Sequence, residues 1–176
     1  MTAIAAMPTG GPGASEQFEQ LYRSSAGDVY AYVASLLRDR AAAEDVTALA
    51  FERAFRRRAL FDIRRGTPRS WLFAIARNAA LDELRRRRHT GALLHEVADE
   101  APGDEDLDGE LAERRLLVRD GLASLEPRDR EVILLKFVGR LSNAELARVL
   151  RCSESNAGTR LHRAIERLRE ACGVTR

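Results

Sequence analysis

Polar and basic side chains near the end of the chain have the types and spacing that could read a DNA duplex. They lie between residues 153 and 171, where apolar residues three and four positions apart predict an amphipathic helix. Hydroxyl, amide, imidazole and guanidinium groups on the exposed face of such a helix can contact base edges and phosphates. The members of this set are Ser155, Asn156, Thr159, Arg160, His162, Arg163 and Arg167. A plain helical hairpin with a solvated basic face is the alternative interpretation.

The elements before this helix would position it for duplex binding. Ser142 and Glu145 have the spacing of a capping box, which predicts the start of a short helix over residues 143–150. A three-residue turn follows, and Ser153 can cap the last helix. Two helices joined by so short a turn form a helix-turn-helix, whose second helix enters the major groove with its N-terminal residues. The apolar residues expected to pack the two helices together are Leu146, Ala147, Leu150, Ala157, Leu161, Ile165 and Leu168.

Charge is segregated along the chain in a way that favours a polyanionic partner. The 176 residues carry 29 basic and 27 acidic side chains, and Lys136 is the single lysine. Residues 51–90 hold 12 arginines against four acids, whereas residues 96–113 hold nine acids and no base. Such asymmetry is typical of proteins that bind nucleic acid. A GC-rich genome would also explain the preference for arginine over lysine, but not the clustering.

The hydrophobic pattern predicts an all-α fold of two small helical domains joined by a flexible acidic linker. The expected helices lie near residues 15–38, 41–58, 68–88, 108–123, 127–139, 143–150 and 153–171, with a short loop over 59–66. The stretch after the third helix is rich in acids, proline and glycine, so it cannot bury enough apolar surface to order itself. The predicted division is a disordered tail over 1–14, a first domain over 15–89, the linker over 90–107 and a second domain over 108–173.

Composition excludes several classes of protein. No window approaches 18 consecutive apolar residues, and the N-terminus lacks the basic start of a signal peptide, so we expect a cytoplasmic protein without membrane insertion. Cys152 and Cys172 lack metal-site spacing, and we expect both to pack as small apolar residues. No nucleophile–base pair, carboxylate pair or phosphate loop emerges. The sequence therefore predicts no enzymatic activity, no metal site and no cofactor.

Six segments, taken in order, resemble regions 2 and 4 of the bacterial sigma-70 factors. The first half contains AEDV at 43–46, AFERAFR at 50–56 and RSWLFAIARNAALD at 69–82. The second half contains LEPRDREV at 125–132, LSNAELA at 141–147 and RLHRAIERLR at 160–169. Their order and spacing are similar to those of the extracytoplasmic-function (ECF) group, which has only these two domains and a short linker. The resemblance covers about residues 16–172 and implies a dissociable RNA polymerase subunit that confers promoter specificity.

The resemblance implies that the second helix binds core RNA polymerase through its beta-prime and beta subunits. The residues carried over to this role are Asp45, Val46, Phe51, Arg53 and Arg57. For Val46 and Phe51, packing in the core is the alternative. Where many family members have a Gln-Glu pair, this chain has Ala48 and Leu49, which weakens a polar contact or shifts it to neighbouring residues.

The resemblance further implies that the loop over 60–68 and the start of the third helix hold the melted −10 element. Unpaired bases need stacking surfaces and hydrogen-bond donors, and this stretch has both. The residues carried over are Phe61, Arg64, Arg65, Arg69, Trp71, Arg77 and Asn78. Core packing is the alternative for Trp71, and Arg85–Arg88 would either follow phosphates or form a solvated helix end.

The last helix would then read the −35 element as a duplex. The residues carried over are Ser153, Ser155, Asn156, Thr159, Arg160, His162 and Arg163. Two positions depart from the family pattern, since many relatives have a β-branched residue at Ala157 and a basic one at Gly158. Glycine inside a helix costs roughly 1 kcal/mol relative to alanine. Either a close approach to the DNA backbone or a less stable domain would account for Gly158.

Core polymerase and promoter DNA are thus the expected partners, and the resemblance implies an anti-sigma factor as a third. The acidic linker is either a solvated tether or a mimic of nucleic acid that lies against a basic surface. Two alternatives to a sigma factor stay open on the sequence. One is a one-component helix-turn-helix regulator that acts without polymerase contact, and the other is a degenerate sigma-like interaction protein.

Overall fold

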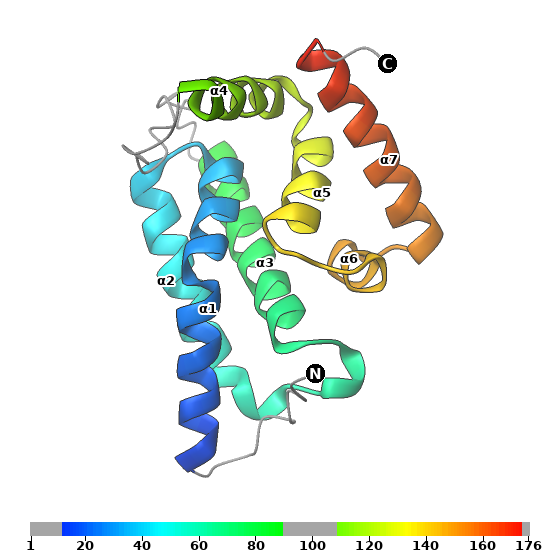
Figure 1. Cartoon of the computed structure of the whole chain (residues 1–176). Helices are drawn as coiled ribbons and strands as arrows, with labels where there is room; N and C mark the ends of the chain where they lie inside the picture. Colours follow the sequence, from blue (N-terminus) through cyan, green and yellow to red (C-terminus); the bar gives the residue numbers. More distant parts are fainter. Residues whose placement is uncertain (1–11, 90–108, 174–176) are drawn as a thin grey trace. The chain divides into compact units, whose positions relative to one another are not determined.

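The computed structural model describes residues 12–89 and 109–173, with side chains placed over 15–89 and 110–173. Every regular element in these ranges is helical, which confirms the all-α fold class (Figure 1). The chain divides into two compact units, residues 1–99 and 100–176. The predicted linker over 90–107 lies outside the described residues, as does most of the predicted tail over 1–14.

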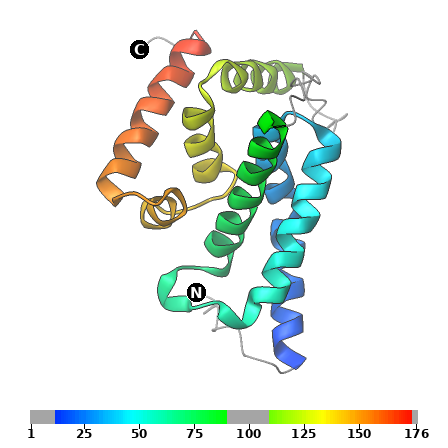
Figure 2. The same cartoon turned by 180° about the vertical axis from the view of Figure 1, so that it is seen from behind.

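Three long helices make up the first unit over its described residues, 12–89 (Figures 1 and 2). α1 spans Pro12–Leu37, α2 spans Arg40–Arg57 and α3 spans Pro68–His89, and each packs against the other two. α1 begins three residues before the predicted start at residue 15, because proline suits the first turn of a helix. The fully buried side chains of this unit include Val29, Tyr32, Val33, Ala43, Ala50, Ala54, Leu72, Phe73, Ala76 and Ala80. The many alanines let the helices approach closely.

The segment between α2 and α3 contains more structure than the predicted loop over 59–66. Two single turns of 3-10 helix follow α2, η1 at Arg58–Leu60 and η2 at Ile63–Arg65. The side chain of Asp62 begins η2, because its Oδ1 accepts a hydrogen bond of 2.9 Å from the backbone N–H of Arg64. This Asx-type turn fixes the backbone that carries the arginines of the segment.

The start of α3 follows its sequence signal. Gly66 ends η2 with φ of 139°, a conformation that favours glycine. The Oγ1 of Thr67 then accepts a hydrogen bond of 3.2 Å from the backbone N–H of Ser70, and Pro68 occupies the first turn. The start of this helix expected near residue 68 is therefore confirmed, and Thr67 caps it.

Arg69 connects α3 to α1. Its guanidinium donates a hydrogen bond of 2.5 Å to Oδ2 of Asp28 and one of 3.2 Å to Oγ of Ser25. A longer bond of 3.4 Å reaches the backbone carbonyl of Ser24. The two ionic side chains are only 21% and 33% exposed, so this ion pair is far less solvated than the surface pairs of the molecule.

Arg87 makes the corresponding connection at the other end of α3. It donates hydrogen bonds of 2.8 Å to Glu83 on its own helix and to Asp39 before α2. Asp39 is also the N-cap of α2, since its Oδ1 accepts from the backbone N–H of Ala42 at 3.0 Å. These contacts, the one from Ala42 first, hold the pKa of Asp39 below its ordinary value.

Four helices make up the described part of the second unit, residues 109–173. α4 spans Gly109–Ser124, α5 spans Pro127–Phe137, α6 spans Asn143–Leu150 and α7 spans Glu154–Ala171. α4, α5 and α6 each pack against α7. The buried apolar residues are Leu125, Val132, Ile133, Leu134, Leu135, Leu141, Leu146, Ala147, Val149, Ala157, Leu161 and Ala164. Of the predicted packing residues in the helix-turn-helix, Leu150, Ile165 and Leu168 are only partly buried.

The buried guanidinium of Arg130 fixes the end of α4 against α5. It donates hydrogen bonds to the backbone carbonyls of Leu122 (2.8 Å), Ala123 (2.7 Å) and Leu125 (3.0 Å). The last carbonyls of a helix have no partner within that helix, so a buried helix end needs donors from elsewhere. Arg130 supplies them from one residue that is 7% exposed.

The caps predicted for the helix-turn-helix are confirmed. Oγ of Ser142 accepts from the backbone N–H of Glu145 at 3.2 Å, and the Glu145 carboxylate accepts from the backbone N–H of Ser142 at 2.9 Å. Oγ of Ser153 accepts from the backbone N–H of Asn156 at 3.2 Å. Between the two helices Arg151 adopts the left-handed conformation, with φ of 55°. That single left-handed residue ends α6 and turns the chain into α7.

Candidate nucleic-acid and polymerase interfaces

One side of α7 is buried and the opposite side carries the polar residues singled out from the sequence. Ala157, Leu161 and Ala164 are at most 8% exposed and face the core of the second unit. The candidate duplex-reading residues Ser153, Ser155, Asn156, Thr159, Arg160, His162 and Arg163 are all exposed. The helix therefore presents hydroxyl, amide, imidazole and guanidinium groups together at its N-terminal end, as a major-groove helix must.

Two of the hydroxyls on this face already have partners within the helix. Ser153 caps α7, and Oγ1 of Thr159 donates to the backbone carbonyl of Ser155 at 3.0 Å. A serine or threonine hydroxyl that makes one hydrogen bond keeps further capacity for a second. Farther along the helix Arg167 pairs with Asp129, and this ion pair connects the C-terminal part of α7 to α5.

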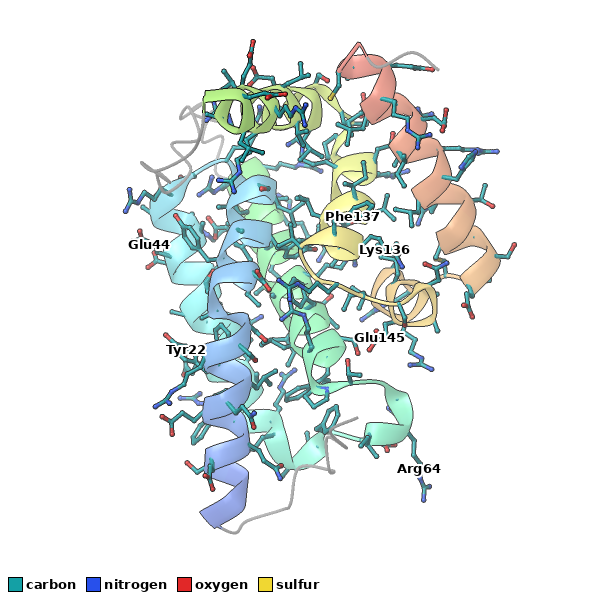
Figure 3. The ribbon with its side chains drawn as sticks, in the orientation of Figure 1. Tyr22, Glu44, Arg64, Lys136, Phe137 and Glu145 are labelled. Atoms are coloured by element: carbon teal, nitrogen blue, oxygen red, sulfur yellow. The ribbon has the colours of Figure 1, made fainter. Side chains whose placement is uncertain are left out.

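The turn between α2 and α3 exposes the arginines proposed for the melted strand. Arg64 and Arg65 lie on η2, and Figure 3 shows the Arg64 side chain extending away from the helices. Phe61 and Trp71 are both half-buried, with ring centroids 5.5 Å apart and planes tilted by 56°. Trp71 is therefore neither fully buried in the core nor fully exposed for base stacking. It packs on Phe61, and part of its surface remains exposed.

The other donors proposed for the melted strand are less available. Arg69 is the ion-pair partner of Asp28 and lies 5.2 Å from the Phe73 ring centroid, so its guanidinium serves the packing of the first unit. Arg77 is partly buried and Asn78 is exposed, one helical turn and more beyond Trp71. The exposed donors of this surface are thus Arg64, Arg65 and Asn78.

The four arginines at the end of α3 do not behave alike. Arg87 is internal, with its side chain 15% exposed. Arg85 pairs with Asp82 at 3.1 Å and Arg86 with Glu83 at 2.7 Å, while their own side chains stay more than half exposed. Arg87 is therefore part of the packing of the first unit. Arg85, Arg86 and Arg88 form a solvated helix end with accessible charge.

The α2 residues carried over for polymerase binding separate into two groups. Val46 and Phe51 are 5% and 6% exposed, so packing in the core is their observed role in the first unit. Asp45 and Arg57 are exposed, and Arg53 is partly exposed with a long ion pair of 3.8 Å to Asp82. The polar surface that α2 offers to a partner is therefore built from charged residues.

An exposed aromatic cluster adjoins this surface, and sequence reasoning missed it. Phe18 of α1 contacts the rings of Phe51 and Phe55 at 6.5 and 5.2 Å, and Tyr22 contacts Phe51 at 4.8 Å. Tyr22 and Phe55 remain 50% and 42% exposed, and Arg58 stacks on Phe55 at 4.0 Å. Figure 3 labels Tyr22 on α1. Only the packing of α1 on α2 shows which of these aromatic side chains reach the surface.

The part of the chain that the structure describes contains neither a metal-binding cluster nor a membrane-spanning helix. No group of three or more histidine, cysteine or acidic side chains is arranged to hold a metal ion there. Over the same residues, none of the helices has both the length and the apolar character needed to cross a bilayer. Cys152 and Cys172 are free thiols, each partly buried.

Comparison with known proteins places both units in one family. The chain matches Sigma-70 region 2 over residues 21–90 and Sigma-70, region 4 over residues 115–168. The first unit thus matches a domain of sigma factors, which sets aside the alternative of a one-component regulator.

Curated relatives align along almost the whole chain. The RNA polymerase sigma factor CarQ of Myxococcus xanthus is 33% identical over 162 residues, covering 92% of each chain. The ECF RNA polymerase sigma factor SigL of Mycobacterium tuberculosis is 32% identical over 162 residues, covering 89% of this chain and 90% of the relative. SigX of Bacillus subtilis, an ECF factor as well, is 31% identical over 163 residues, with 88% and 83% covered.

Solved structures share the fold. The sigma factor RpoE in complex with the anti-sigma factor NepR from Bartonella quintana has a TM-score of 0.75 at 23% identity, covering 92% of this chain and 99% of the other. CnrH in complex with the cytosolic domain of CnrY has a TM-score of 0.64 at 25% identity, covering 92% and 91%. The chain belongs to the sigma-70 family of RNA polymerase sigma factors, in the extracytoplasmic-function group.

Proposed function

We propose that the two units of this sigma factor have separate roles in promoter-directed initiation. The first unit docks on core polymerase and captures the unpaired strand, and the second unit recognises duplex DNA. The observation that carries the proposal is the match of both units to sigma regions 2 and 4 in one chain, with exposed charged residues on each unit where a partner is needed. It supports a binding protein without enzymatic activity of its own, working in the cytoplasm where core polymerase and promoters are.

The first unit binds core polymerase through the exposed charges of α2. Asp45, Arg53 and Arg57 make the polar contacts, while Val46 and Phe51 hold α2 in place from the core. Ala48 is exposed and Leu49 is half-buried where many relatives have a polar pair, so the contact relies more on neighbouring residues. The exposed rings of the aromatic cluster around Phe18, Tyr22 and Phe55 extend the apolar part of this contact.

The η2 turn of the first unit holds the unpaired strand of the −10 element. Arg64, Arg65 and Asn78 donate to phosphates and base edges, and the Phe61–Trp71 pair offers a ring surface for stacking. Leu60 and Ile63 are 79% and 47% exposed on the same turns and add apolar surface beside the arginines. Stacking of this kind tolerates different bases because every base has a flat face.

Core polymerase is needed for strand opening. Each DNA stacking step is worth about 1.4 kcal/mol, so opening on the order of ten steps costs about 14 kcal/mol. Each stacked base returns only about 1–3 kcal/mol, and the η2 turn has room for few. The factor therefore captures a strand whose separation depends on the whole holoenzyme.

The second unit reads the −35 element with α7. Ser155, Asn156 and Thr159 at its N-terminal end face base edges, and Arg160 and Arg163 provide charged donors. His162 and Ser153 complete the contact surface. The helix-turn-helix geometry supports this assignment, because the second helix of the motif enters the major groove by its first turns.

An anti-sigma factor is the third partner that we assign. The fold of this chain is shared with an RpoE sigma factor whose solved structure contains the anti-sigma factor NepR. Such a partner would cover exposed surface that polymerase also needs, and so regulate the amount of active factor.

Run-off transcription tests the proposal. Purified chain is mixed with core polymerase on fragments of genomic DNA, and the 5′ ends of the transcripts are mapped. We expect new start sites that core polymerase alone does not produce. If the folded chain neither binds core nor yields new start sites, the proposed function is wrong and a sigma-like interaction protein replaces it.

A further inference from the structure

The fold of the second unit does not require a glycine at position 158. It is the fifth residue of α7, well inside a helix of 18 residues. Glycine at such a position destabilises a helix relative to alanine. A Cβ built on Gly158 would meet no atom within 4 Å, and its φ does not lie in the positive range. An alanine would therefore fit here without strain.

Three other glycines of the described chain have a clear structural reason, namely Gly121, Gly139 and Gly66. A Cβ on Gly121 of α4 would lie 2.6 Å from Sγ of Cys172, so this glycine permits α4 to pack on the end of α7. A Cβ on Gly139 would lie 2.5 Å from the backbone carbonyl oxygen of Leu135. Gly66 has a positive φ. None of these reasons applies to Gly158.

The neighbours of Gly158 place it at the edge of the candidate DNA-reading face. On a helix, residues three and four positions away are surface neighbours. For Gly158 these include exposed Ser155 on one side and exposed His162 on the other, while Leu161 is buried. Gly158 therefore lies on the flank of α7, between the polar face and the core.

The flank of a recognition helix is the part that meets the walls of the groove. The major groove is about 12 Å wide, and a helix with its side chains is about 10–12 Å across, so little room remains. The groove walls are the sugar–phosphate backbones. A flank without a side chain gives the helix clearance toward one wall, which a Cβ and larger groups would remove.

We propose that Gly158 is a clearance position that lets α7 seat against the sugar–phosphate backbone at one wall of the −35 major groove. The inference rests on the proposed function, and it assigns to this residue a role in fit rather than in base reading. The side chains at Ser155 and Asn156 then reach the base edges because the helix is not held away from them.

The test compares Gly158→Ala and Gly158→Leu with the wild-type chain and with Gly27→Ala. Gly27 is the matched control, since it lies inside α1, also has nothing within 4 Å of an added Cβ and is outside the residues proposed to contact DNA. The probe is a promoter duplex found by run-off transcription, and binding is measured as DNase protection of its −35 region by each holoenzyme. Thermal unfolding of each full chain is measured in parallel.

Both alanine variants should unfold at a higher temperature than wild type, by about 4 °C for a domain of this size. Gly158→Ala should nevertheless weaken −35 protection at least 10-fold, Gly158→Leu should weaken it further, and Gly27→Ala should leave it unchanged. Protection by the Gly158 variants equal to that of wild type overturns the inference and leaves the proposed function intact. If the wild-type holoenzyme protects no −35 region on any mapped promoter, the proposed function itself is wrong, and the inference falls with it.

Discussion

The Arg69 guanidinium is engaged with α1 in the free protein. Its bonds to Asp28 and Ser25 are shielded from water, and the arginine also lies beside the Phe73 ring. Removing one partner of such a pair leaves the other charge poorly solvated, which is more destabilising than the loss of a surface pair. At the residue scale, arginines in similar sequence surroundings therefore have different structural roles.

Arg69→Ala should therefore lower the free energy of unfolding by about 2 kcal/mol. A double-mutant cycle with Asp28→Ala, followed by urea unfolding, should show a coupling of about 1 kcal/mol or more. Arg64→Ala is the matched control, since this arginine is exposed on η2 and its loss should change stability by less than about 0.5 kcal/mol. Equal effects of the two substitutions on stability would contradict the structural role of Arg69.

Glu83 makes the stability of the first unit sensitive to acid. Hydrogen bonds from Arg86 and then Arg87 lower the pKa of its carboxyl from the ordinary 4.5 to about 2. A group with a lowered pKa in the folded state stabilises that state above its unfolded pKa and loses this contribution as pH falls. The contribution of Glu83 is complete above about pH 4.5 and disappears as the pH approaches 2.

Glu83→Gln should remove this part of the acid dependence. We expect the variant to be less stable than wild type at pH 7 by about 2 kcal/mol, because Arg87 loses a charged partner in a poorly solvated position. The difference should shrink between pH 4.5 and pH 2 in urea titrations followed by circular dichroism. A difference that stays constant over this pH range would show that the ionisation of Glu83 does not contribute.

At the scale of elements, local signals predicted the helices and long-range contacts could not be predicted. The capping box at Ser142 and the Thr67 cap involve residues three apart, so the sequence shows them directly. The Arg69–Asp28 pair joins residues 41 positions apart, and the arginine run at the end of α3 gives no sign that Arg87 alone would turn inward. Such pairs depend on how whole helices pack.

The conformation of the turns was also beyond sequence reasoning. Arg38, Arg140 and Arg151 all adopt the left-handed conformation, where glycine or asparagine would be the usual signal. Similarly, Phe51 and Phe55 are four residues apart and so lie on the same stripe of α2, but the packing of α1 on α2 buries the first and leaves the second exposed. The predicted duplex-reading side chains do share one exposed side of α7, because helical periodicity alone decides this.

The two serine caps of the helix-turn-helix provide a prediction at this scale. Ser142 caps α6 and Ser153 caps α7, so Ser142→Ala and Ser153→Ala should each lower stability by about 1 kcal/mol. Only Ser153 belongs to the proposed −35 contact, so only its substitution should also weaken duplex protection by the holoenzyme. Equal losses of protection in the two variants would show that cap stability, and not a contact from Ser153, controls DNA binding.

At the scale of the whole molecule, polymerase docking and promoter reading depend on different surfaces of the chain. Asp45→Ala should reduce the affinity for core polymerase by several-fold, measured by fluorescence titration of labelled full-length chain, because an exposed charge on α2 is lost. Unfolding of the variant should match wild type, since Asp45 is exposed. Once holoenzyme is formed at saturating factor, start sites should be unchanged. Altered start sites at full occupancy would place Asp45 in promoter reading instead.

Permanganate probing of unpaired thymines tests whether the first unit holds the melted strand while the second unit reads the duplex. Holoenzymes containing wild type, Arg160→Ala or the double variant Arg64→Ala, Arg65→Ala are bound to a mapped promoter, and reactivity near the start site is compared with DNase protection at −35. Wild type should show both signals. Arg160→Ala should lower both together, by about 1–3 kcal/mol if it reads a base. The double variant should keep −35 protection and lose the unpaired thymines. Loss of −35 protection in the double variant, or unpaired thymines at wild-type levels in it, would contradict the account.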